Sequence, residues 1–124
     1  MPQVPAWPLY KQLGLPRLLL DAAQIMRERG LAKGVTIHTG SGRVDVLGAL
    51  ALATGVPVKA LSGDIREMVD AAPPRRGVLL LIAWEALEAW LETEISEWND
   101  SADTTERDVS NALTAVSQLI EAVL

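Results

Sequence analysis

Apolar residues recur at helical spacing along most of the chain, and the clearest run lies between Val78 and Trp98. Its members are spaced by three and four, so one helix would place them within a narrow arc. They are Trp84, Leu87, Leu91, Ile95 and Trp98. The first two turns, Val78 to Ala83, are apolar on all sides, which is typical of a central helix. We therefore expect one long central helix that ends at Asn99 and Asp100.

Other segments combine helical periodicity with start or stop residues. Gly30 and Gly55 are suitable stops, and Ser62 is a candidate N-cap. Thr105 and Asp108 have the spacing of a capping box. The predicted helices span residues 16–29, 45 or 47–54, 63–71 and 105 to the C-terminus. Since few residues separate the last helix from the central one, we expect these two to form an antiparallel hairpin.

Two segments lack this periodicity. The β-prone runs 35–38 and 43–46 flank a Gly-rich turn, which predicts a small hairpin over 35–46, or else a loop. Pro2, Pro5 and Pro8 argue against a regular helix in residues 1–15. We expect an N-terminal arm over 1–15 that packs on a single domain of residues 16–124. The predicted fold is mainly α, a compact bundle of about five helices around the central C-terminal helix.

Composition narrows the function classes. The chain has 124 residues, 49% of them hydrophobic, which is enough for one domain with its own core. The formal net charge of −5 and the lack of a basic cluster argue against nucleic-acid binding. With no secretory signal and no apolar run long enough to cross a bilayer, we expect a cytoplasmic protein without membrane contact. The sequence has no Cys, which excludes disulfides and thiol catalysis.

Titratable residues suggest no catalytic or cofactor motif. His38 is the only histidine, and without Cys it cannot build the common zinc sites. Ser41 lies three residues from His38 but lacks a nucleophile-elbow context. Glu85, Glu88 and Glu92 share a flank of the central helix. Such carboxylates either bind a cation or form a solvated charge stripe. We predict no metal and no cofactor.

The string Trp98–Asp100 is the most distinctive local feature. Asn and Asp tolerate left-handed backbone and satisfy loose backbone groups, so the string can be a helix stop. Alternatively, Trp98, Asn99 and Asp100 line a small polar site, to which Arg107 and His38 could contribute.

Several short strings resemble a family of small uncharacterised proteins of actinobacteria and their phages. They are Leu19–Ala23, Glu28–Gly34, Gly48–Leu50, Trp98–Asp100 and the Thr-capped C-terminal helix. The resemblance covers residues 18–123. The chain departs from the family pattern at Leu31, where Trp is usual, in lacking a Cys before Gly48, and at Thr104, where Arg is common. If the family Arg pairs with the Asp of the Trp-Asn-Asp string, Arg107 would have to replace it. The resemblance implies a biological setting rather than a reaction.

Two functional hypotheses remain. The first is a non-enzymatic protein-interaction domain, of phage origin or not, that binds a host protein or a second copy of itself. The second is a small-ligand or metal-binding domain that uses the Glu85, Glu88 and Glu92 flank or the Trp98–Asp100 corner. For a phage-encoded chain, the compartment would be the host cytoplasm.

Overall fold

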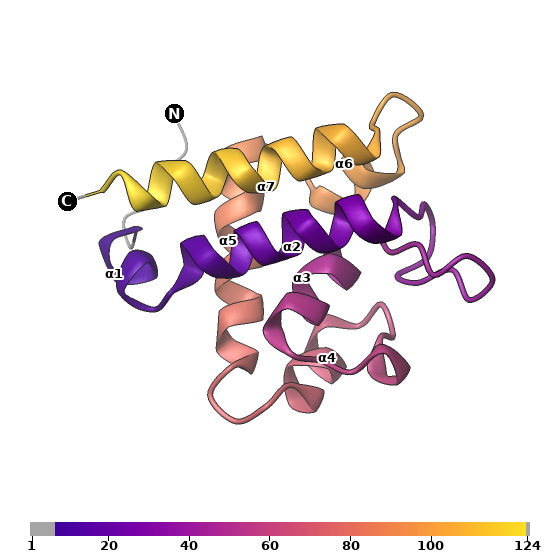
Figure 1. Cartoon of the computed structure of the whole chain (residues 1–124), viewed down its shortest axis with the longest axis horizontal. Coiled ribbons are helices and arrows are strands. Elements are labelled where there is room, and N and C mark those ends of the chain that lie inside the picture. The colour runs from indigo at the N-terminus through magenta and orange to yellow at the C-terminus, as the bar shows by residue number, and fades with distance from the viewer. Residues whose placement is uncertain (1–6, 124) are drawn as a thin grey trace.

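The computed structural model describes residues 7–123, and every regular element in this part is helical (Figure 1). The α-helices are α1 (Trp7–Gln12), α2 (Leu15–Arg29), α3 (Val46–Thr54), α4 (Ile65–Ala71), α5 (Gly77–Leu91), α6 (Ile95–Asp100) and α7 (Glu106–Glu121). A short 3-10 helix, η1, covers Val58–Ala60. The mainly α prediction is confirmed. No helix within residues 7–123 is long and apolar enough to cross a membrane.

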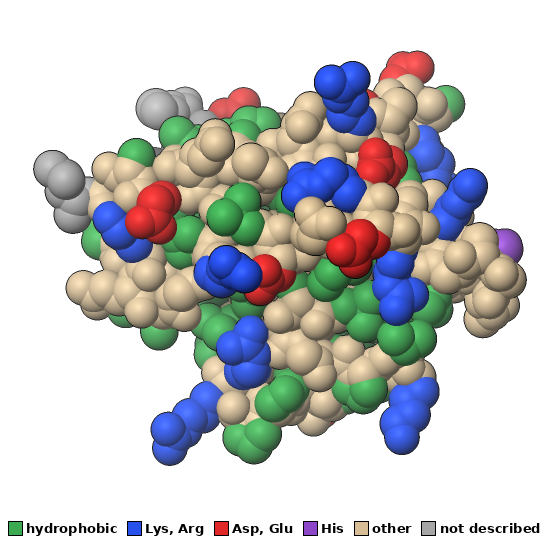
Figure 2. All heavy atoms as spheres, viewed as in Figure 1, with side chains coloured by type: hydrophobic (Ala, Val, Ile, Leu, Met, Phe, Trp, Pro, Cys, Tyr) green, Lys and Arg blue, Asp and Glu red, His purple; other side chains and the backbone are tan. Residues whose placement is uncertain are grey.

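Helices α2 and α7 lie side by side and antiparallel, and α5 passes behind them at a steep angle (Figure 1). The apolar stripe of α7 is fully buried, and each such side chain contributes about 1.5–3 kcal/mol. Ser117 Oγ donates to Pro16 O at 2.7 Å across this pair. The antiparallel partner of α7 is therefore α2, and the predicted hairpin with the central helix is wrong. On the outer face of this layer, basic and acidic side chains are interspersed (Figure 2).

The predicted central helix is in fact two helices. Glu92 ends α5 in a left-handed conformation (φ 59°), and its N–H donates to Glu88 O at 3.0 Å. Helix α6 starts at Ile95 and its last two residues are Asn99 and Asp100, so the helical segment ends where the sequence predicts. The apolar spacing hides this interruption because Ile95 is again buried when α6 returns to the core. Helix α5 keeps a central position, in contact with α3, α4, α6 and α7.

Residues 31–45 form a folded loop with isolated bridges, so the predicted hairpin strands are wrong. Val44 forms a parallel bridge with Leu31 and an antiparallel bridge with Ile37. The turn lies where the sequence predicts it, since His38 N–H donates to Arg43 O at 2.8 Å. Val44 is completely buried between the two chain segments. The two segments that pair with Val44 contribute one residue each, Leu31 and Ile37, so no continuous ladder of strand hydrogen bonds forms.

The predicted start and stop residues of the helices are confirmed in most cases and corrected in one. The capping box of Thr105 and Asp108 is present, and Gly30 and Gly55 end their helices as predicted. Helix α4 is capped by Asp64, whose Oδ1 accepts from Arg66 N at 2.9 Å, and not by Ser62.

The N-terminal segment contains a helix that the sequence argument excluded. Helix α1 includes Pro8, which is tolerated because the N–H groups of a first turn have no partner within the helix. Tyr10 is buried, and Lys11 Nζ donates to Val123 O at 2.9 Å, which holds α1 against the end of α7. The rest of the predicted arm, residues 1–6, lies outside the described residues.

Candidate ligand-binding cleft

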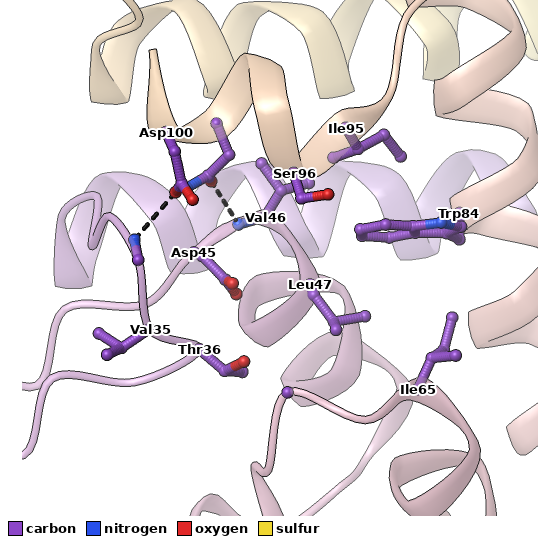
Figure 3. A pocket seen from close by; sticks show the side chains of 13 residues that line it. Val35, Thr36, Asp45, Val46, Leu47, Ile65, Trp84, Ile95, Ser96 and Asp100 are labelled. Carbon is purple, nitrogen blue, oxygen red and sulfur yellow. Dashed lines mark hydrogen bonds between the residues drawn. The ribbon is translucent and has the colours of Figure 1, made fainter. Parts of the chain in front are cut away.

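A cleft of about 360 Å³ lies where the 34–36 loop, the N-terminus of α3, the start of α4, α5 and α6 meet. Polar residues line one side, and Trp84, Ile95 and Ile65 lie on the opposite side (Figure 3). The lining comprises Gly34, Val35, Thr36, Asp45, Val46, Leu47, Gly63, Ile65, Trp84, Ile95, Ser96, Asn99 and Asp100. It contains two carboxylates and no Lys, Arg or His.

Asp45 is held in the cleft by its role as the N-cap of α3. Its Oδ1 accepts from Gly48 N at 2.7 Å. Burial raises the pKa of Asp45 to about 6, the Gly48 hydrogen bond partly opposes this rise, and the charge of Asp100 adds to it. The position of Gly48 is tight, because a Cβ there would lie 2.7 Å from Thr36 O. The close approach of α3 to the 34–36 loop therefore requires glycine.

Asn99 ties α6 to two other segments and is 2% exposed. Its Oδ1 accepts from Val46 N at 2.9 Å, and its Nδ2 donates to Ala32 O at 3.0 Å. The same Nδ2 donates to Asp100 Oδ1 at 2.9 Å. Both polar atoms of the Asn99 amide are therefore used in hydrogen bonds within the protein. Asn99 affects the cleft by positioning the segments to which it is bonded.

Asp100 lies at the mouth of the cleft and is exposed. Its Oδ1 accepts from Gly34 N at 2.9 Å as well as from Asn99 (Figure 3). Both bonds use the same oxygen, and Oδ2 forms no hydrogen bond with another atom of residues 7–123. This second oxygen is therefore available to a ligand.

Thr36 carries a buried hydroxyl that no atom of residues 7–123 satisfies. The residue is only 8% exposed, yet Oγ1 forms no hydrogen bond within the described chain. The hydroxyl faces the interior of the cleft beside Gly63, where a Cβ would lie 3.1 Å from it (Figure 3). A buried hydroxyl without a partner costs about 1–3 kcal/mol, which a ligand atom could offset.

A family model matches residues 12–119, which is most of the chain and includes the whole cleft. The chain belongs to DUF6197, a family of unknown function. No curated protein and no solved structure matches it.

The residues singled out from the sequence fall into separate places in this DUF6197 protein. Asn99 and Asp100 line the cleft, but Trp98 packs half-buried against the core outside its lining. His38 is exposed beside Ser41, whose Oγ lies 3.0 Å from His38 Nδ1, and both border a different hollow. Arg107 is exposed, and the only ion pair within residues 7–123 joins other residues, so it does not pair with Asp100.

The three glutamates of the predicted flank do lie together, but on the solvent-exposed surface. Glu85, Glu88 and Glu92 border a surface hollow of about 400 Å³ with Glu94. Glu85 and Glu92 are exposed, and Glu88 is half-buried. No group of three or more His, Asp or Glu in the described part of the chain is arranged to hold a metal ion.

The sequence pattern points to Asn99 and Asp100 but not to Thr36, Asp45 and Trp84, which also line the cleft. In the sequence, Thr36 and Asp45 fall in the two β-prone runs, Asp45 is also a possible helix start, and Trp84 belongs to the apolar stripe of the predicted central helix. The sequence does contain a local signal for the role of Asp45, because an Asp at the start of a helix is a preferred N-cap. Gly48, three residues later, lies where the backbone is too crowded for a side chain. No local pattern brings residue 36 next to residue 100.

Proposed function

We propose that this protein binds a small organic molecule in the cleft between α3, α4, α5 and α6. The observation that carries the proposal is the unsatisfied Thr36 hydroxyl, buried in a hollow that pairs a polar side with an apolar side. Ligand sites are commonly clefts of roughly 300–1,000 Å³ with a few convergent polar groups, and this one is at the small end. The proposal includes no catalytic step.

A fragment screen by protein-observed NMR tests the proposal. A ligand that binds only the folded protein at 100 times its Kd stabilises it by about 2.7 kcal/mol, so thermal shift provides a second readout. We expect hits to perturb Gly34, Gly63 and the Trp84 indole, which come from three different elements. A screen whose hits leave these signals unchanged would contradict the proposal.

A blocking variant gives the matched control. Ser96 is exposed, lines the cleft and makes no side-chain hydrogen bond within residues 7–123, so Ser96→Phe should fill the cleft without unfolding the protein. Glu97→Phe adds the same ring at the next exposed position of α6, outside the cleft. Binding should be lost in the first variant and kept in the second.

Protein binding is a second proposal, supported by exposed apolar side chains outside the cleft. Large apolar side chains are exposed on α1, on the turn that follows it, on α2 and on α7. They are Leu9, Leu13, Leu20 and Leu119. Sedimentation velocity over a wide concentration range tests self-association, and a single monomeric species throughout would contradict it. The cytoplasm of an actinobacterium or of a phage-infected host is the setting we propose for either role.

A further inference from the structure

We infer that the ligand of this cleft is a small organic ammonium ion, with its charged head between Asp45 and Asp100 and its hydrocarbon body against Trp84. The inference rests on the proposed ligand-binding function and specifies the chemical class of the ligand. It stands on the arrangement of acceptors, on the absence of basic groups from the lining and on the apolar wall opposite.

The polar side of the cleft offers acceptors to a donor-rich head. Asp45 uses one carboxylate oxygen on Gly48 N–H, and Asp100 uses one on Gly34 N–H and the Asn99 amide. The second oxygen of each carboxylate has no partner in the described chain. Thr36 Oγ1 is unpaired on the same side (Figure 3). A primary ammonium group carries three N–H donors and no acceptor, which matches these three groups. Hydrogen bonds between such charged partners are about twice as strong as neutral ones.

The charges around the cleft favour a cation. No Lys, Arg or His lines it, so nothing within the lining neutralises the two carboxylates. Lys33 precedes the 34–36 loop, but its Nζ donates to Ser101 O. Asp64 caps α4, and Arg66 and Glu97 are exposed residues outside the lining. An ammonium head between Asp45 and Asp100 offsets their repulsion, whereas an anion would add to it and a neutral head would leave it unchanged.

The apolar side argues for an organic ion rather than a bare metal ion. The side chains of Trp84, Leu47, Ile65 and Ile95 offer no oxygen ligand to a metal, but they can cover the hydrocarbon part of a ligand. Within residues 7–123 no group of three or more metal-binding side chains is arranged around a common point. The cleft volume of about 360 Å³ suits a body of small-molecule size.

Three ligands of nearly equal shape test the charge requirement at pH 7.5: 2-phenylethylammonium, 2-phenylethanol and 3-phenylpropionate. Affinities come from calorimetry, and NMR shifts at Gly34 and Gly63 locate the binding. We expect the ammonium ion to bind at least about tenfold more tightly than the alcohol, since its hydrogen bonds to the carboxylates are charge-assisted and those of the alcohol are weaker. The carboxylate should bind most weakly.

Charge-removing variants assign the effect to named residues. Asp45→Asn keeps a helix cap, and Asp100→Asn keeps an oxygen for Gly34 N–H. Each should weaken ammonium binding about tenfold or more and leave alcohol binding unchanged. Glu97→Gln removes the same charge from an exposed position outside the cleft and should change neither affinity.

A pH arm uses the unmodified protein, so it does not depend on whether a variant folds. Because burial raises the pKa of Asp45 to about 6, ammonium affinity should fall about tenfold between pH 7.5 and pH 5 while alcohol affinity stays constant. An ammonium affinity that is equal at both pH values would overturn the inference.

The remaining outcomes separate the two proposals. If the alcohol or the carboxylate binds in the cleft as tightly as the ammonium ion, the charge inference is wrong and ligand binding stands. The same holds if none of the three binds while other fragments do. If no fragment of any charge shifts the cleft signals, the proposed function itself fails.

Discussion

Two acidic regions of this molecule invite opposite interpretations when they are compared. The outer flank of α5 carries Glu85 and Glu88, Glu92 follows at the end of the helix, and water reaches these side chains. The cleft has only Asp45 and Asp100, which come from segments far apart in the chain. Burial beside Asp100 raises the pKa of Asp45 to about 6. A carboxylate that the fold holds at such a cost is a better candidate for ligand binding than a longer row of solvated ones.

The largest expected effect comes from removing the amide that builds the cleft. Asn99→Ala deletes the partners of Val46 N–H and Ala32 C=O. Each buried group left unsatisfied costs about 1–3 kcal/mol, so we expect a loss of about 4 kcal/mol in the free energy of unfolding. Urea denaturation measures it.

Asn111→Ala provides the control, because Asn111 is exposed on α7 and should change stability by less than about 0.5 kcal/mol. Equal losses in the two variants would show that Asn99 does not hold the cleft together.

The second-largest expected effect is a change in the free energy of unfolding that depends on pH. The pKa of Asp45 in the folded protein, about 6, lies above its ordinary value of 3.8, so the protonated form favours folding. That contribution is fully present below about pH 4 and is lost as the pH rises through 6. Asp45→Asn stays neutral and keeps the cap, so relative to the unmodified protein it should gain about 2–3 kcal/mol on going from pH 4 to pH 8.

Thermal or urea unfolding at both pH values checks this gain. Asp103→Asn, at an exposed position outside the cleft, should show no comparable pH dependence. A stability difference for Asp45→Asn that does not vary with pH would remove the contrast between the two acidic regions.

Much of the helical architecture was predictable because its determinants are local. The stripe of α7, its capping box and the glycine stops at Gly30 and Gly55 follow from periodicity and backbone preference. The interruption at Glu92 was not predictable in the same way, because Glu is an ordinary helix residue and the apolar spacing continues past it. The chain turns there because Ile95 reaches the core from a new helix, and tertiary packing outweighs local propensity.

The candidate site was only half predictable, for a related reason. Asn99 and Asp100 stand next to each other in a distinctive string, so the sequence points to them. Thr36 and Asp45 acquire their meaning only when α6 packs over the N-terminus of α3. The same packing leaves Trp98 outside the lining and His38 on a separate hollow. A set of residues drawn together by tertiary contacts has no spacing for a sequence argument to find.

A smaller effect is expected at the break between α5 and α6. A non-glycine residue in the left-handed region costs about 1 kcal/mol relative to glycine, and Glu92 has φ 59°. Glu92→Gly should therefore raise the free energy of unfolding by about 0.5–1 kcal/mol, and Glu92→Val should lower it. Thermal unfolding of both variants checks the sign. A loss of stability in the glycine variant would indicate that a continuous helix is the better description.

The smallest effect is expected on the flank itself, and it tests the comparison most directly. The variant Glu85→Gln, Glu88→Gln, Glu92→Gln removes the like-charge pair of Glu85 and Glu88 within α5, together with the charge of Glu92 at the end of the helix. Such pairs cost only about 0.2–0.5 kcal/mol, so stability should rise by a few tenths at most. Millimolar Mg²⁺ or Ca²⁺ should leave the unfolding midpoints of this variant and of the unmodified protein equally unchanged, because water already solvates these carboxylates. A cation-dependent rise that disappears in the variant would make the flank a metal site and reverse the ranking of the two acidic regions.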